Sequence, residues 1–221
     1  MQNLKFKNKN LRLTCDGGAA TGKSTGAKMI AKKYGLTFLS SGLLYRYAAY
    51  LTLKIKPKNK VKFLKSKFLN LNYKKLKNLN LHSPKISAES ALIAKNLAIR
   101  NILKKYQRSF IHKNKKCVIE GRDASTKILP NSDLKFFFIC NLDIASKRRF
   151  KELKRGNPNI TLNTIRKALK LRNISDKKRK HSPLKKHKNA VVVNTGKLSK
   201  KAMVTKMSFY VERVLEKKYG N

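Results

Sequence analysis

The sequence predicts an α/β fold in which helices flank a central parallel sheet. Three observations support this prediction. Near the N-terminus a strand-like run ends in a glycine-rich loop and leads into a helical segment, strand-like and helix-like segments alternate along the chain, and residues 133–140 include the continuous apolar run FFFIC. Parallel strands that are buried on both faces have such unbroken runs. Alternation of strands and helices is typical of layered α/β domains.

Each element is predicted from the periodicity of its apolar residues. Strands are expected where short apolar runs end in polar or glycine-rich clusters, at residues 11–18, 36–42, 117–123, 133–140 and 190–196. Helices are expected where apolar residues recur every three or four positions, at residues 24–35, 43–54, 88–111, 142–156, 161–180 and 201–220. A glycine ends the first helix, and the turn cluster GNPN separates the two helices before the last strand.

Residues 54–85 differ in composition from the rest, being rich in Lys, Asn and alternating Leu. Two alternating runs on either side of a Lys-rich turn predict a β-hairpin in a small inserted lobe. Low complexity of this kind is also compatible with a mobile, poorly ordered segment.

The length of 221 residues and a hydrophobic content of 41% are enough for one sizeable core. No apolar run is long enough to cross a bilayer, and the first residues lack the features of a secretory signal, so a cytoplasmic location is expected. Three widely spaced cysteines, Cys15, Cys117 and Cys140, lie in or beside apolar runs. We expect them to be small core residues and not a disulfide framework or a metal site.

The charge balance is strongly basic, with 55 Lys and Arg against 10 Asp and Glu, a formal net charge of +45. Such a field attracts anions, including both nucleotides and nucleic acids. The basic residues are spread over the whole chain, so solvated surface lysines are the favoured interpretation of this charge. Weak, salt-sensitive nonspecific binding to nucleic acid is expected in either case.

The sharpest chemical signal is a segment that fits the pattern G-x-x-x-x-G-K-[ST] between a predicted strand and a predicted helix. Its residues, with the one that follows, are Gly17, Gly18, Ala19, Ala20, Thr21, Gly22, Lys23, Ser24 and Thr25. Backbone N–H groups of such a loop bind phosphate oxygens, Lys23 can bridge the transferred phosphate and Ser24 can ligate magnesium. The motif therefore predicts a P-loop phosphotransferase, but it does not identify the acceptor.

Four other polar clusters are candidates for the acceptor site, namely Ser41–Arg46, Arg100, Gly121–Asp123, and the set Arg172, Asp176 and Arg179. The third cluster follows the carboxyl end of a strand, where α/β sheets bind their ligands. The members of the last set are four and then three residues apart, so they share one helix face. That face could instead be a solvent-exposed ion-pair face, and Arg100 a solvated surface residue.

Together these segments resemble bacterial cytidylate kinase, in the same order and over most of the chain. The matching pieces are CDGGAATGKST, FLSSGLLYR, IRNILKKYQR, VIEGRD with LPNSDLKFFF, SKRR, and RNISDKKRKHSPL. The Gly-Arg-Asp element and the R-x-x-x-D-x-x-R-x-x-x-P-L string are the most distinctive of them. The resemblance implies a P-loop kinase with a core at residues 8–53 and 86–221. It also implies a monophosphate-binding lobe at about 54–85 and a helical lid at about 148–180.

For the acceptor phosphate, the resemblance implies two groups of residues. Ser41, Tyr45 and Arg46 would line the monophosphate site. Arg100 and Arg122 would bind the phosphate group itself.

For the rest of the acceptor, the resemblance implies that Asp123 reads the cytosine edge. Asp176, flanked by Arg172 and Arg179, would contact the sugar hydroxyls.

For catalysis, the resemblance implies charge neutralisation by Lys23 and by Arg148, Arg149 and Arg172 in or beside the lid. Glu120, at a strand end, would hold a magnesium-bound water. Three positions depart from the family pattern, and one of them is Asn189, which stands where an Asp is common. Ser40 stands where the family usually has Asp, and Lys95 falls where a serine touches the base.

The resulting hypothesis is a monomeric enzyme that uses ATP and Mg²⁺ to phosphorylate CMP, and also dCMP, giving the diphosphate and ADP. One alternative is another small P-loop kinase that acts on a different monophosphate or on a metabolite. A second alternative, from a different class, is a basic nucleic-acid-binding protein.

Overall fold

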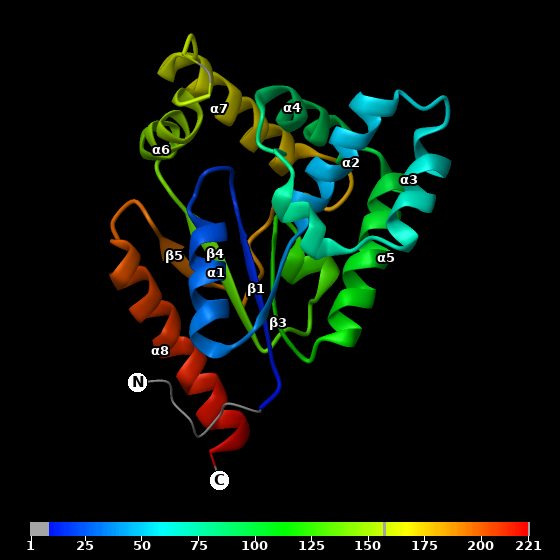
Figure 1. Cartoon of the computed structure of the whole chain (residues 1–221). Helices are drawn as coiled ribbons and strands as arrows, with labels where there is room; N and C mark the ends of the chain where they lie inside the picture. The colour runs from blue at the N-terminus through cyan, green and yellow to red at the C-terminus, as the bar shows by residue number, and fades with distance from the viewer. Residues whose placement is uncertain (1–8, 157, 221) are drawn as a thin grey trace.

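The computed structural model describes residues 9–156 and 158–220, and it folds around a five-stranded sheet (Figure 1). The strands are β1 (Leu11–Gly17), β2 (Thr37–Ser40), β3 (Lys116–Gly121), β4 (Leu134–Ile139) and β5 (Val191–Asn194). Their order across the sheet is β2-β3-β1-β4-β5, and every neighbouring pair is parallel. The predicted α/β fold with a central parallel sheet is confirmed, and β1 lies at its centre.

Eight α-helices and two short helical turns connect or follow these strands in the described part of the chain. The helices are α1 (Lys23–Tyr34), α2 (Ser41–Ile55), α3 (Lys60–Leu69), α4 (Pro84–Ile93), α5 (Leu97–Lys113), α6 (Leu142–Lys154), α7 (Leu162–Lys178) and α8 (Lys200–Tyr219). The turns are η2 (Tyr73–Asn78), a 3₁₀ helix, and η3 (Ala124–Ile128), one π-helical turn. None of the described helices is long and apolar enough to span a membrane.

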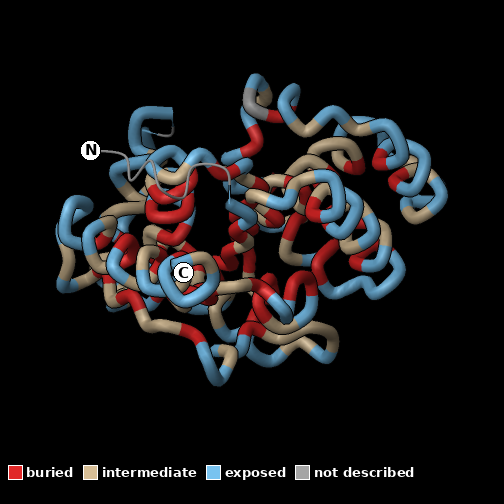
Figure 2. Tube along the Cα trace, turned by 90° about the horizontal axis from the view of Figure 1, so that it is seen from below, coloured by how far each residue is buried: buried red, intermediate tan, exposed pale blue. Residues whose placement is uncertain are grey.

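The buried side chains form two large cores, which meet at the sheet. One core joins β1 and β4 to α1 and α8 and includes Phe136 and Met207. The other joins β2 and β3 to α2 through α5 and includes Leu64 and Leu103. Figure 2 shows the buried residues on the strands and the inward sides of the helices, with exposed residues outside. The helices thus pack against the strands of the sheet, and the carboxyl ends of the strands stay available for a site.

The prediction of a β-hairpin within residues 54–85 is wrong, because this segment folds into α3 and η2. The alternating leucines suggested a strand, but Leu64 and Phe68 are four residues apart and both are buried on the side of α3 that packs against α5. The side chain of Asn59 caps α3 by accepting a hydrogen bond from the Lys62 N–H at 2.9 Å. Burial of Leu64 and Phe68 in the core therefore outweighs the local alternation of leucine with polar residues.

The single helix predicted at residues 88–111 is also wrong, since the structure contains two helices, α4 and α5, joined by a short turn. Asn96 accepts a hydrogen bond from the Ile99 N–H at 3.0 Å and so caps the second helix. Lys95 is exposed in this turn.

The cysteines behave as small core residues, as expected. Cys15 and Cys117 are buried, Cys140 is partly buried, and all three are free thiols. The signal-sequence expectation rests on residues 1–14, of which residues 1–8 lie outside the described residues. So does Asn157 of the predicted turn.

Candidate active site

The glycine-rich loop connects the end of β1 to the start of α1, as its motif predicts. A Cβ at Gly17 would lie 2.4 Å from the backbone oxygen of Phe138, so only glycine lets β1 run this close to β4. Gly22 caps α1 with φ at 78°, a left-handed conformation that favours glycine. Ser24 and Thr25 are exposed in the first turn of α1. The helix N-terminus and its hydroxyl groups thus face a site that can receive an anion.

Lys23 forms a buried ion pair with Glu120 at the end of β3. The Lys23 Nζ lies 3.4 Å from the Glu120 carboxylate and donates to the Gly18 carbonyl at 2.9 Å. Burial, followed by the nearby Arg122, lowers the pKa of Lys23 to about 8. Burial would raise the pKa of Glu120, but the Lys23 ammonium and the Ser40 hydroxyl outweigh it and lower that pKa. Glu120 is therefore a carboxylate at neutral pH.

Asp16, the last polar residue of β1, fixes the loop after β3. Its buried carboxylate accepts hydrogen bonds from the Ala124 N–H at 2.8 Å and from the Ser125 N–H and hydroxyl at 2.7 and 2.6 Å. Burial raises the pKa of Asp16 to about 6, and the hydrogen bonds from Ser125 oppose that rise. This contact holds η3, and with it Arg122 and Asp123, against the centre of the sheet.

The predicted monophosphate residues of α2 lie at the start of that helix and along its inner side. Ser41 is buried and its hydroxyl hydrogen-bonds to the Gln107 side chain of α5. Arg46 donates to the Leu81 carbonyl at 3.0 Å and to the Ser87 hydroxyl at 2.8 Å. Burial, and then the positive charges of Arg172 and other arginines, lowers the pKa of Arg46 to about 9. Several cations therefore converge here with few carboxylates to balance them.

Ser40 has a definite role in the structure although it departs from the family pattern. Its hydroxyl donates to the Glu120 carboxylate at 2.5 Å and accepts from the Leu43 N–H at 3.3 Å as the cap of α2. Its N–H donates to the Tyr73 hydroxyl of η2 at 2.8 Å. Ser40 thus connects the metal-ligand candidate, the acceptor helix and the inserted segment.

Asp123 lies between two arginines. Arg100 donates to one carboxylate oxygen at 2.6 Å and to the Ala94 carbonyl at 3.1 Å. The Nη2 of Arg179 lies 3.9 Å from the other oxygen, too far for a hydrogen bond. Tyr45 stacks beside this pair, with its ring centroid 5.5 Å from the Arg100 guanidinium. Arg100 is buried and not a solvated surface residue.

Asp176 forms a second buried ion cluster with Arg122 and Arg179, at 2.9 and 3.3 Å. The surface ion-pair interpretation is wrong, because Asp176 is 8% exposed. The shared helix face is correct only in part, since α7 ends at Lys178 and Arg179 follows in extended backbone. The side chains still converge.

Two guanidinium nitrogens in this region are buried without a hydrogen-bond partner. They are the Nε of Arg172 and the Nη2 of Arg179. Burial, and then Arg122, lowers the pKa of Arg172 to about 10. Buried donors without acceptors are costly, so these nitrogens indicate a place where a ligand supplies oxygen atoms.

Arg148 and Arg149 of α6 point in different directions. Arg148 donates to the Thr195 carbonyl at 2.8 Å and to its hydroxyl at 3.0 Å, and the same hydroxyl donates to the Thr21 carbonyl of the phosphate loop at 2.8 Å. Arg149 donates to the His82 carbonyl at 3.0 Å and pairs with Glu152. Arg148 therefore faces the loop side and Arg149 the inserted segment.

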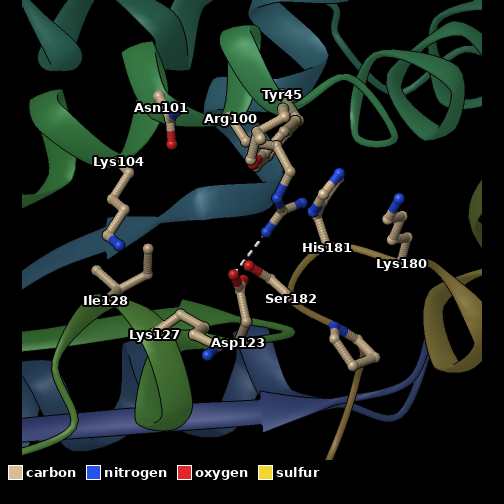
Figure 3. A pocket seen from close by; sticks show the side chains of 12 residues that line it. Tyr45, Arg100, Asn101, Lys104, Asp123, Lys127, Ile128, Lys180, His181 and Ser182 are labelled. Atoms are coloured by element: carbon tan, nitrogen blue, oxygen red, sulfur yellow. Dashed lines mark hydrogen bonds and ion pairs between the residues drawn. The ribbon is translucent and has the colours of Figure 1, made fainter.

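A cavity of about 310 Å³ opens beside Asp123 and Arg100. Figure 3 shows Tyr45 and Arg100 on one side of it and Asp123 opposite them, with the Arg100–Asp123 contact drawn as a dashed line. Lys104, Lys127, Lys180 and His181 also line it. The cavity brings together three of the sequence-predicted clusters.

Asn173 and Thr195 belong to the site but are missing from the sequence prediction. Asn173 of α7 accepts a hydrogen bond from the Ala19 N–H of the phosphate loop at 3.0 Å. Thr195 links Arg148 to Thr21, as described above. Asn173 lies within the string RNISDKKRKHSPL but at one of its variable positions, and Thr195 follows a predicted strand, so only their position in space identifies them.

Comparison with known proteins finds a family model described as cytidylate kinase, which matches residues 13–213. The cytidylate kinase of Thermosipho melanesiensis is 36% identical over 198 residues, covering 85% of this chain and 90% of the relative. That of Rickettsia canadensis is 32% identical over 219 residues, covering 96% and 99%. That of Mesomycoplasma hyopneumoniae is 32% identical over 217 residues, covering 93% and 95%.

Solved structures with the same fold are more distant in sequence. An uncharacterised protein from Eubacterium ventriosum superposes with a TM-score of 0.54 at 14% identity, covering 93% of this chain and 99% of the other. Shikimate kinase from Bacteroides thetaiotaomicron superposes with a TM-score of 0.50 at 12% identity, covering 91% and 98%. At these identities the likeness concerns the fold alone.

Proposed function

The chain belongs to the cytidylate kinase family, and we propose that the site described above transfers the γ-phosphoryl group of ATP to CMP and dCMP. The products are the nucleoside diphosphate and ADP. The observation that carries this proposal is the convergence of cations around Arg122. Burial and the neighbouring positive charges, Arg122 among them, lower the pKa values of Lys23, Arg46 and Arg172, so this group of cations needs anionic partners. All of them come from one chain, so a monomer suffices for the reaction.

The donor nucleotide binds at the glycine-rich loop. Backbone N–H groups of residues 17–22 and the N-terminus of α1 receive its phosphates, and Lys23 leaves the Gly18 carbonyl to bridge the transferred group. The residues present fit Mg²⁺, since Ser24 offers an exposed hydroxyl and Glu120 a carboxylate whose pKa is lowered. When bound with ATP, the ion neutralises charge on the β- and γ-phosphates.

The acceptor binds between α2 and the loop after β3. Ser41, Arg46 and Arg122 hold its phosphate, because Ser41 directly follows the end of β2 and Arg122 is close enough to Arg46 to affect its pKa. The resemblance implies that Arg100 binds the phosphate, but we place it with Asp123 at the base, because it donates to the Asp123 carboxylate and both line the cavity in Figure 3.

The sugar of the acceptor contacts Asp176. This carboxylate lies between Arg122 and Arg179, and Arg172 is close enough to affect its pKa. The unpartnered nitrogens of Arg172 and Arg179 then acquire oxygen acceptors from the ligand. These roles use every buried cation of the site.

Transfer needs no covalent intermediate with the protein. An oxygen of the acceptor phosphate attacks the γ-phosphorus as the bond to the β-phosphate oxygen breaks, and the residues supply alignment and charge stabilisation. Arg148, Arg149 and Arg172 on α6 and α7 neutralise the charge of the transition state. Closure of this segment excludes water from the transferred group.

The test is ADP formation from Mg-ATP with CMP, dCMP, UMP, AMP and GMP offered separately as acceptors. CMP and dCMP are expected to give the highest turnover, and Lys23→Ala is expected to abolish it. Lys28→Ala, on the exposed side of the same helix, is the matched control and keeps full activity. A different preferred monophosphate would contradict the assignment of the base. Turnover with none of them would contradict the assignment of the reaction.

A further inference from the structure

The outer face of α5 carries cations that the proposed reaction does not use. A hollow of about 580 Å³ lies against it and is lined by Asn101, Lys104, Lys105, Arg108, Ser109 and His112. These positions repeat at three and four residues, so they form one continuous face. The opposite face of the helix, with Leu103 and Gln107, is buried in the core. We call the six residues the α5 face.

The α5 face continues into the cavity beside Asp123. Asn101 and Lys104 line both hollows. Lys127 of η3 and Lys180 after α7 add two more ammonium groups at the cavity, and Figure 3 shows Lys104 and Lys127 on one side of Asp123 and Lys180 on the other. Three separate segments thus contribute positive charge to one connected surface.

This surface lacks the carboxylates that balance charge elsewhere on the described chain. All ten acidic residues lie within the described ranges, and none belongs to α5. Asp123 is the one carboxylate that lines either hollow, and it is already bound by Arg100. Some basic surfaces elsewhere do carry pairs, such as Lys33–Glu212 and Lys218–Asp133.

The cations of the α5 face make no ion pairs within the described residues. Lys104, Lys105 and Arg108 belong to none of the salt bridges there, and neither do Lys127 and Lys180. From residue 101 to residue 112 the face extends about 16 Å along the helix axis. An unpaired row of this length fits a string of phosphates better than a single one.

We propose that the α5 face binds the phosphodiester backbone of single-stranded nucleic acid. Lys104, Lys105 and Arg108 contact successive phosphates, while Asn101 and Ser109 offer neutral hydrogen-bond donors. A single strand is favoured over a duplex because the strand can follow the face into the cavity, where Tyr45 offers an aromatic edge. The strand then lies across the entrance of the acceptor pocket and excludes CMP, a consequence that rests on the proposed function.

The test measures binding of a fluorescein-labelled 20-nucleotide poly(U) RNA by anisotropy, between 50 and 300 mM salt. The triple variant Lys104→Gln, Lys105→Gln, Arg108→Gln removes three charges and keeps good helix formers on an exposed helix side. The matched control Lys200→Gln, Lys201→Gln, Lys217→Gln makes the same change of net charge on α8, far from α5 in Figure 1. Circular dichroism and thermal melting verify that both variants are folded.

The α5 variant is expected to bind at least about tenfold more weakly at 100 mM salt. The slope of log affinity against log salt should become shallower by about 2, or about 0.7 for each of three lost contacts. The α8 variant should stay within about twofold of the wild type. Equal weakening in both variants would mean that the field of the whole molecule binds RNA. That result, or no binding by the wild type, would overturn the proposal.

Competition supplies a second readout. Saturating CMP is expected to weaken poly(U) binding to the wild type severalfold, and unchanged binding would overturn the claim that the strand crosses the acceptor pocket. Because the anisotropy assay contains no ATP, its result is independent of turnover. A chain that binds RNA through the α5 face but phosphorylates no monophosphate would overturn the proposed function and leave this inference standing.

Discussion

The side chain of Asn173 binds the phosphate loop, where its Oδ1 accepts a hydrogen bond from the backbone N–H of Ala19 at 3.0 Å. Asn173 belongs to α7, 154 residues further along the chain. A donor that is engaged by the protein is not free for a phosphate oxygen. The proposed binding of ATP phosphates by the N–H groups of residues 17–22 therefore requires that this side chain be displaced.

This contact predicts that Asn173→Ala binds ATP more tightly. Releasing one neutral hydrogen bond of about 0.5–1.5 kcal/mol corresponds to an affinity gain of about two- to tenfold. Asn173→Asp should weaken binding by about tenfold or more, because its carboxylate would bind the donor more strongly and repel the phosphates. Calorimetric titration with ATP in the absence of acceptor measures both effects. Leu171→Ala, on the exposed side of α7, is the control. Weaker binding by Asn173→Ala would show that the residue assists ATP instead.

The lowered pKa of Lys23, about 8, predicts a pH-dependent affinity for ATP. Phosphate oxygens favour the protonated amine, so the pKa of Lys23 rises when ATP binds and a proton is taken up. Affinity should be constant below about pH 8 and fall above it, by up to about tenfold per pH unit. Calorimetry in buffers of different ionisation enthalpy measures the uptake directly.

Lys23→Arg keeps its charge throughout this range and should lose the pH dependence. Lys28→Met, on the exposed side of the same helix, should retain it. Uptake that persists unchanged in Lys23→Arg would assign the titration to another group.

The double role of Ser40 predicts two separable losses in Ser40→Ala. The variant removes the cap of α2, which costs about 1 kcal/mol of unfolding free energy, and it removes the hydrogen bond that lowers the pKa of Glu120. The acidic limb of turnover should then move to higher pH. The matched control is Ser199→Ala, which removes the cap of α8, where Ser199 accepts from the Ala202 N–H at 3.1 Å.

Urea unfolding should report a loss of stability in both variants, and a larger one in Ser40→Ala because that variant also loses the hydrogen bond to Glu120. Only Ser40→Ala should shift the pH profile. The sign follows from Glu120, whose folded-state pKa is lowered, so its carboxylate form is lost as pH falls through that value. A pH profile of Ser40→Ala that matches the wild type would show that the protonation state of Glu120 does not control turnover.

The buried cluster around Asp176 predicts a large effect of Asp176→Asn on the acceptor side. The variant loses charge-assisted hydrogen bonds with Arg122 and Arg179 and leaves the positive charge of these arginines without its carboxylate partner. A loss of about 1.5–3 kcal/mol corresponds to a decrease in kcat/KM for CMP of about ten- to one-hundred-fold. The KM for ATP should change little. Asp143→Asn, which breaks the exposed pair with Arg166, is the control and should have almost no effect. Equal changes for ATP and CMP would indicate a general loss of structure.

Local patterns were sufficient for most elements of the fold. The unbroken apolar run that became β4 and the glycine spacing around Lys23 depend on neighbours in sequence, and both were predicted correctly. The inserted segment was not, because Leu64 and Phe68 adopt a helical spacing only where the core receives them. The break before α5 depends on a single capping residue, Asn96, within a stretch whose apolar periodicity is helical on both sides.

The sequence by itself determined the five strands of the sheet, the helices outside residues 54–111, the phosphate loop and the identity of the polar clusters. These features rest on residue types and short spacings. Only the tertiary structure decided which groups meet. Lys23 with Glu120, Arg100 with Asp123 and Asn173 with Ala19 join different elements, and their contacts follow from the parallel order of the sheet. The pKa of each ionisable group depends on those long-range contacts and on burial. No local sequence pattern contains this information.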